Sequence, residues 1–262
     1  MILGYFSALL VGLTLGLLGG GGSILTVPIL VYVLGVSPVL ATAYSLFVVG
    51  TTSLIGAGRN MIKAMVDIKV AIVFAIPAFI AVYLTRRYIV PAIPEEIFTI
   101  GDFILTKDLA VMLFFAIIML AASVSMIKGR KEKEVDTNAK LKLPYIVIEG
   151  LVVGVLTGLV GAGGGFLIIP ALVLLANLPM KRAVATSLVI IAVKSLIGFM
   201  GDVQNLTIDW PFLLTFTGFS IIGIFIGIYL NKFIDGKSLK KGFGWFVLVM
   251  GIYIIAKELI FM

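Results

Sequence analysis

Two glycine clusters and one lysine are the residues of this chain whose types and spacing suggest chemistry. The clusters, residues 19–23 (GGGGS) and 161–165 (GAGGG), each precede a short apolar run. Glycine runs disfavour helix, and a helix that starts after such a break presents free N–H groups and the positive end of its dipole, which suits an anion. Lys194 lies in the middle of the apolar segment 183–201, too deep for its ammonium to reach either interface easily.

Hydroxyl side chains share a helical face with this lysine. Ser187 and Lys194 fall on one face at i, i+7 spacing, and Ser45 and Thr52 occupy the corresponding face of an earlier segment. The sequence therefore predicts an oxyanion site between the two segments, formed by Gly21, Gly22, Ser23, Ser45, Thr52, Gly164, Gly165, Ser187 and Lys194. Two alternatives stay open: the glycines serve only close helix packing, and the lysine pairs with a carboxylate for structural reasons.

Three acidic residues have candidate roles. Glu149, inside the predicted segment 145–160, is the coupling candidate, as a proton carrier or as a counter-ion to Lys194; the alternative is an ordinary position at the cytoplasmic interface. Asp67 and Asp209 each directly precede an apolar run, which predicts helix N-caps.

The composition excludes most other chemistry. Apolar residues make up 61% of the 262 residues and charged residues 13%, against about 45–50% and about 25% in soluble domains. The chain has no Cys and no His, and its acids are scattered, so we expect no metal site, no cofactor and no enzymatic activity. The net charge of +7 does not indicate a nucleic-acid partner, because membrane proteins carry Lys and Arg on their cytoplasmic side.

The elements that must position these residues are apolar helices. The predicted segments are 2–18, 24–35, 39–57, 68–84, 109–127, 145–160, 166–178, 183–201, 210–230 and 242–260. A full membrane span needs about 20 residues, so 24–35 and 166–178 are predicted half-helices. The fold class is therefore an all-α integral membrane protein with about 8–10 membrane helices.

The two glycine clusters belong to an internal duplication. Sliding the chain by 142 residues places Pro28 on Pro170 and gives 17 identities among the 41 positions from Gly16 to Gly56. Asp67 then falls on Asp209. This predicts two homologous membrane repeats, 1–127 and 144–262, joined by a basic cytoplasmic linker, 128–143.

The loop charges predict the orientation of the second repeat. The linker, Lys181-Arg182 and the stretch 232–241 are basic, whereas 201–210 contains two Asp and no Lys or Arg, so the basic loops face the cytoplasm. The first repeat is inverted relative to the second if residues 88–100 stay outside the membrane, and parallel to it if they cross. We favour inversion.

The paired signatures GLLGGGGSILTVPIL and GLVGAGGGFLIIPAL, the A-x-x-S-L segments that follow them, the basic linker and the chain length resemble the sulfite exporter TauE/SafE family. The resemblance implies a multi-pass transporter in the cytoplasmic membrane of a bacterium or archaeon. Its substrate would be a small anion such as sulfite, sulfoacetate or a related sulfur compound.

The sequence contains no P-loop motif, so we expect a secondary carrier. Its expected partners are the lipid bilayer and the anionic substrate, with a coupling proton or Na⁺ and a second copy of the chain in a homodimer as further candidates. Two alternative functions stay open: an anion channel, which would use the same residues, and a membrane scaffold or sensor without coupled transport.

Overall fold

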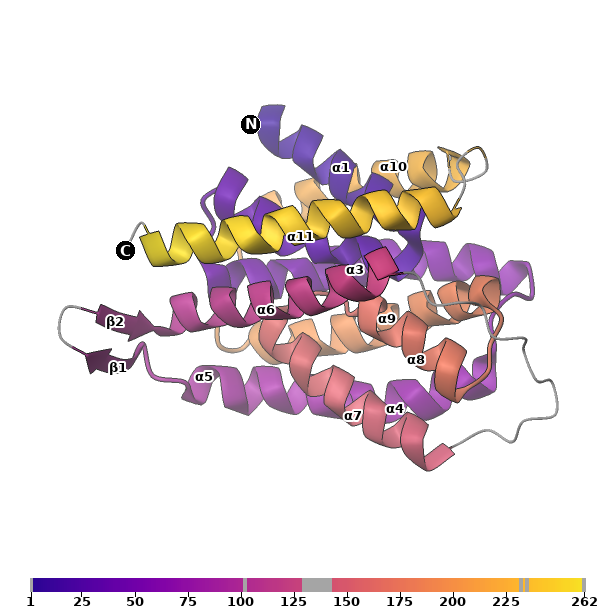
Figure 1. Cartoon of the computed structure of the whole chain (residues 1–262), viewed down its shortest axis with the longest axis horizontal. Coiled ribbons are helices and arrows are strands. Elements are labelled where there is room, and N and C mark those ends of the chain that lie inside the picture. The colour runs from indigo at the N-terminus through magenta and orange to yellow at the C-terminus, as the bar shows by residue number, and fades with distance from the viewer. Residues whose placement is uncertain (1, 101–102, 129–142, 231–232, 234–235, 261–262) are drawn as a thin grey trace.

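The computed structural model of the chain describes residues 2–100, 103–128, 143–230, 233 and 236–260. Apart from its two end residues, the predicted linker 128–143 lies outside these described residues, as does part of the basic stretch 232–241. The described residues form a bundle of long helices (Figure 1).

The elements of the first half are α1 (Ile2–Leu18), η1 (Gly19–Leu25), α2 (Thr26–Pro28), η2 (Ile29–Val33), α3 (Pro38–Ile62), α4 (Ile68–Leu84), η3 (Thr85–Ile89), α5 (Val90–Ala92), β1 (Glu96–Ile100), β2 (Phe103–Thr106) and α6 (Lys107–Lys128). Those of the second half are α7 (Leu143–Val160), α8 (Gly165–Leu175), α9 (Met180–Asp202), α10 (Trp210–Leu230) and α11 (Gly236–Ile260). The predicted segments 68–84 and 210–230 coincide with α4 and α10.

The prediction of an all-α membrane protein is confirmed. Among the described residues, six helices are long and apolar enough to cross a bilayer, and three shorter apolar helices accompany them. The short ones include Gly22–Val33, as expected from the limited length of the apolar run after the first glycine cluster. A row of exposed apolar side chains on helices such as α10 is what lipid contact requires, because lipid tails are as apolar as these side chains.

The two central helices are α3 and α9, which pack on each other and are the most buried of the six membrane-length helices. On either side, α1 packs against α10 and α4 packs against α7, while α6 and α11 run alongside each other (Figure 1). Because Lys194 lies on α9 and Thr52 on α3, the fold places both faces predicted for the site in the middle of the bundle.

Helix contacts in the two halves match one another at the 142-residue offset. In the α1–α10 pair, a methyl group on Gly12 would collide with the carbonyl of Ser220; in the α4–α7 pair, one on Gly154 would collide with the carbonyl of Ala78, the residue that aligns with Ser220. Gly16 contacts Gly227, and Gly158, which aligns with Gly16, contacts Thr85, which aligns with Gly227. Contacts exchanged in this way are what a two-fold relation between the halves would produce.

The predicted N-caps are confirmed, and their contacts with the central helices also match at the 142-residue offset. The carboxylates of Asp67 and Asp209 each accept a hydrogen bond from the backbone N–H three residues later, at 3.0 and 3.1 Å. The backbone N–H of Asp67 donates to the hydroxyl of Thr186, and that of Asp209 donates to the hydroxyl of Tyr44, which aligns with Thr186. Each central helix therefore holds the start of an outer helix from the opposite half.

Residues 88–100 were expected either to stay outside the membrane or to cross it. Residues 88–100 do not cross the bundle: the helix that begins at Ile68 continues to Ala92, and an antiparallel hairpin of β1 and β2 follows. The hairpin was not predicted, because its short apolar strands have the same composition as the neighbouring helices.

The prediction that both glycine clusters are unwound is wrong for the first one, which forms the 3₁₀ helix η1.

Candidate functional site

The second glycine cluster interrupts the helical structure between α7 and α8. Residues 161–164, here called the unwound segment, have no helical structure, and Gly161 and Gly164 have φ of +69° and +73°, values that only glycine adopts readily. Among the described residues, no backbone hydrogen bond uses the N–H of Gly163 or Gly164. These N–H groups, together with those of Gly165 and Phe166 at the start of α8, are donors available to an anion, whereas the N–H groups of Leu167 and Ile168 bond to the carbonyl of Gly164.

The structure brings the two glycine clusters into contact. A methyl group on Gly165 would lie closer than 3.0 Å to the backbone of Gly20, so the two chains can approach this closely only because both residues are glycine. Gly163 packs on Val49 of α3 and Ile191 of α9, which align with each other at the repeat offset. The unwound segment therefore lies against both central helices.

Lys194 points at the unwound segment. Its side chain is completely buried, and its Nζ donates to the hydroxyl of Thr157 at 2.8 Å. A methyl group on Gly164 would lie 3.3 Å from this Nζ, so the ammonium is beside the open backbone. Within the described residues no carboxylate forms an ion pair with Lys194. A buried charge without a counter-charge is costly, so the ammonium has a strong electrostatic preference for an anion.

The predicted hydroxyl residues are buried but are not equivalent. Ser23, Thr52 and Ser187 donate to carbonyls of their own helical turns. Such hydroxyls must break a local hydrogen bond before they can donate to an anion. Ser45 is also completely buried, and its hydroxyl has no hydrogen-bond partner among the described residues, which makes it the hydroxyl best prepared to bind.

Gly21 and Gly22 contribute less than expected. Both lie in the 3₁₀ helix η1, where each N–H bonds to a carbonyl three residues earlier. They are therefore poorer donors to an anion than Gly164 and Gly165. A 3₁₀ helix of seven residues is unusually long, and such stretches often mark hinges.

Sequence reasoning missed three hydroxyl residues near this centre. Thr157 is the hydrogen-bond partner of Lys194, and its sequence signal was a lone hydroxyl in an apolar helix one turn before the glycine cluster. Ser53 and Ser195 align at the repeat offset, and both have buried hydroxyls without a partner among the described residues. These are buried polar groups at equivalent positions of α3 and α9 whose hydrogen bonds are not made within the described structure.

The interpretation of Glu149 as a counter-ion to Lys194 is wrong. Glu149 lies eight residues before Thr157 on α7, about 12 Å along the helix axis. It lies half-buried in an apolar groove that residues such as Tyr145 and Val152 also line. Its role as a coupling residue stays a prediction.

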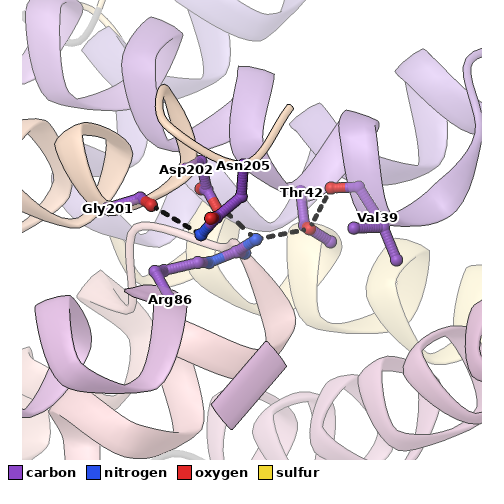
Figure 2. A network of polar contacts seen from close by, with 6 residues as sticks. All are labelled: Val39, Thr42, Arg86, Gly201, Asp202 and Asn205. Carbon is purple, nitrogen blue, oxygen red and sulfur yellow. Dashed lines mark hydrogen bonds and ion pairs between the residues drawn. The ribbon is translucent and has the colours of Figure 1, made fainter. Parts of the chain in front are cut away.

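A second buried cation was not predicted as part of a site. The guanidinium of Arg86 is completely buried; its Nη1 donates to Thr42 Oγ1 at 2.9 Å and lies 3.5 Å from Asp202 Oδ2 (Figure 2). In the sequence, Arg86 comes at the end of an apolar run beside Arg87, a pattern that is typical of an exposed loop. Its burial follows from the extension of the helix beyond Leu84 and from the packing of α9 against it.

No group of three or more acidic residues able to hold a metal ion occurs in the part of the chain that the structure describes. The candidate site around Lys194 brings together a cation, hydroxyls and backbone N–H groups. Such a set recognises a negatively charged oxygen-bearing molecule.

Comparisons with known proteins agree with a transport role. The family described as Sulfite exporter TauE/SafE matches residues 5–254. A "Probable membrane transporter protein" of Xylella fastidiosa (strain 9a5c) is 29% identical over 94% of this chain and 91% of that protein. The "Probable membrane transporter protein YunE" of Bacillus subtilis (strain 168) is 27% identical over 88% of each chain.

The "Probable membrane transporter protein MJ0441" of Methanocaldococcus jannaschii is 36% identical over 43% of this chain and 45% of that protein. No solved structure matches significantly. These relatives are named as membrane transporters and not as enzymes, which agrees with a multi-pass membrane protein that has six membrane-length helices.

Proposed function

This chain belongs to the sulfite exporter TauE/SafE family of membrane transporters, and on that premise we propose that it is a secondary carrier of small sulfur oxyanions or organosulfonates, such as sulfite or sulfoacetate. The anion would bind between the two halves, at Lys194, the unwound segment and the first turn of α8. Ser45 would supply a further donor.

One observation carries this proposal: Lys194 is completely buried beside open backbone and has a neutral hydroxyl as its hydrogen-bond partner. A lysine at the centre of a membrane helix costs about 2.5–3.5 kcal/mol of insertion free energy. A hydrogen bond to a neutral hydroxyl offsets only part of this cost. A bound anion supplies the missing counter-charge. A small oxyanion suits the site because the site offers several N–H donors, and each donor can bond to a different oxygen of the anion.

The two-repeat organisation, 1–127 and 144–262, is part of the proposal. The matched contacts of Gly12 with Ser220 and of Gly154 with Ala78 support it, as do the paired caps. When adjoining α, 3₁₀ and π turns are grouped into apolar helices, such as Gly22–Val33 and Ile68–Ala92, each half of the described structure contributes five, and residues 88–100 form no further crossing, which supports inverted repeats. In such a carrier, alternating access moves one repeat against the other around a fixed site.

The closing contact of this proposed movement would be the one between Gly20 and Gly165. It joins segments of different halves through backbone atoms of two glycines, with the side chain of Ile191 packed beside Gly20. The 3₁₀ turns of η1 provide a place where the first half can change its winding.

The test is transport in proteoliposomes that contain the purified protein and labelled sulfite or sulfoacetate. We expect Lys194→Met to abolish saturable uptake, because the methionine keeps the side-chain length but removes the charge. The matched control is Lys181→Met, the same substitution at an exposed position of the same helix, which should leave uptake unchanged.

Unchanged uptake in Lys194→Met would refute the assignment of the site. Flux without countertransport would identify a channel, and the absence of flux in the unmodified protein would identify a scaffold or sensor.

A further inference from the structure

The guanidinium of Arg86 contacts other residues through Nη1, whereas its Nε–Nη2 edge makes no hydrogen bond in the described structure. Its Nη1 contacts Thr42 and Asp202, both through single oxygen atoms (Figure 2). Its Nε and Nη2 are buried, and neither has a hydrogen-bond partner among the described residues. Two N–H groups of a fully buried arginine without acceptors are costly, so this edge is prepared for a ligand.

The geometry of the free edge selects the chemistry of that ligand. Nε–H and one N–H of Nη2 point in parallel from the same side of the planar guanidinium, and they match two oxygens on one central atom. Sulfite, sulfonates, thiosulfate and carboxylates present such a pair of oxygens. A halide ion does not, because it offers a single acceptor.

The position of Arg86 connects it with the site at Lys194. The unwound segment begins at Gly161, which packs closely on Thr42, the hydroxyl acceptor of Arg86. It ends at Gly164, which lies beside the ammonium of Lys194. A buried cation therefore stands at each end of the same four residues. An anion bound anywhere along these four residues would be attracted by a buried cation.

The local backbone is also unusual at Arg86. It lies in the π-helical turn η3 (Thr85–Ile89), and π turns within helices occur frequently at functional sites. The hydroxyl of the preceding residue, Thr85, is buried and has no partner in the described structure. It is a further buried donor on the same π-helical turn.

The acidic partner of Arg86 is held weakly. Asp202 Oδ2 lies 3.5 Å from Nη1 and makes no hydrogen bond in the described structure, a long separation for an arginine–carboxylate pair. Asp202 is the last residue of α9, so its side chain can move without disturbing a continuing helix. An incoming anion therefore competes with a carboxylate that is not bound bidentately.

We propose that Arg86 forms a second oxyanion site, in which its Nε–Nη2 edge binds two oxygens of the anion and Asp202 competes with that anion. The role of this site as a station on the transport path rests on the proposed function, whereas the binding itself does not. The site would pass the anion along the unwound segment to or from Lys194.

The test uses the purified full chain with Lys194→Met, which removes the first site. Sulfite, thiosulfate and chloride are titrated at constant ionic strength, and binding is measured by calorimetry. We expect sulfite and thiosulfate to bind this variant and chloride not to bind. Adding Arg86→Lys, which keeps the charge but loses the two-pronged edge, should weaken oxyanion binding about tenfold or more. Adding Arg87→Lys, at the neighbouring arginine that bonds to Asn205, should not.

Asp202→Asn gives an independent result if Arg86→Lys fails to fold. Removal of the competing carboxylate should tighten oxyanion binding, and unchanged or weaker binding would overturn the proposal. The absence of oxyanion binding to Lys194→Met would also overturn it, and the transport site at Lys194 would then stand alone. If Lys194→Met keeps both binding and transport, the proposed function fails while the Arg86 site remains.

Discussion

The contact between the glycine clusters gives a quantitative prediction for Gly165→Ala. The three atoms nearest to the added methyl group would be backbone atoms of Gly20, all closer than 3.0 Å, whereas carbon atoms in contact are about 3.5–4.0 Å apart. Backbone atoms cannot rotate away as a side chain can, so the two segments must separate by roughly 0.5–1 Å or more. Overpacking of this kind costs about 1–3 kcal/mol of unfolding free energy.

The control for this substitution is Gly218→Ala. Gly218 lies in the interior of α10, and a methyl group there would meet nothing within 4 Å. Alanine is a better helix former than glycine, so this variant should gain about 0.5–1 kcal/mol. The same chemical change should therefore have opposite signs at the two positions, with a difference of roughly 1.5–4 kcal/mol.

The assay is thermal unfolding of both purified variants in detergent, with and without sulfite. One kcal/mol corresponds to about 2–4 °C for a domain of about this size. Gly165→Ala should melt several degrees below Gly218→Ala and should lose most of its stabilisation by sulfite, because α8 is displaced from the site. If both variants are equally stable and respond equally to sulfite, the reasoning that the clusters touch at the anion site is refuted.

Three further predictions concern single side chains. Lys194→Met should melt at a higher temperature than the unmodified protein in anion-free buffer, by an amount equivalent to about 1–3 kcal/mol, because it removes a buried unpaired charge; a lower melting temperature would indicate a structural lysine. Thr157→Val should reduce both stability, by about 1–3 kcal/mol, and the affinity for sulfite in calorimetry, since it leaves the ammonium without its hydroxyl; unchanged affinity would contradict the site. Asp67→Ala and Asp209→Ala should each lower the unfolding free energy by about 0.5–2 kcal/mol, and their effects should add in the double variant; a single variant without effect would contradict the capping role.

Local patterns in the sequence determined much of this molecule. Apolar run lengths located the membrane helices, because a helix in lipid must satisfy its own backbone and must be long enough to cross. A carboxylate directly before an apolar run marked the caps at Asp67 and Asp209, because a cap depends only on neighbouring backbone groups. A lysine in the middle of an apolar segment marked the proposed site, because burial of Lys194 followed from the length of the segment around it.

The tertiary structure decided what depends on residues far apart in the chain. Arg86 looked like a loop residue, and it is buried because its helix continues past Leu84 and packs against the end of α9, where Asp202 lies. The first glycine cluster winds into a 3₁₀ helix, although glycine runs by themselves disfavour helix. Local preferences fix where helices begin, but the end of the helix that carries Arg86, the burial of its charge and the winding of a glycine run depend on the surfaces packed around them, which come together only on folding.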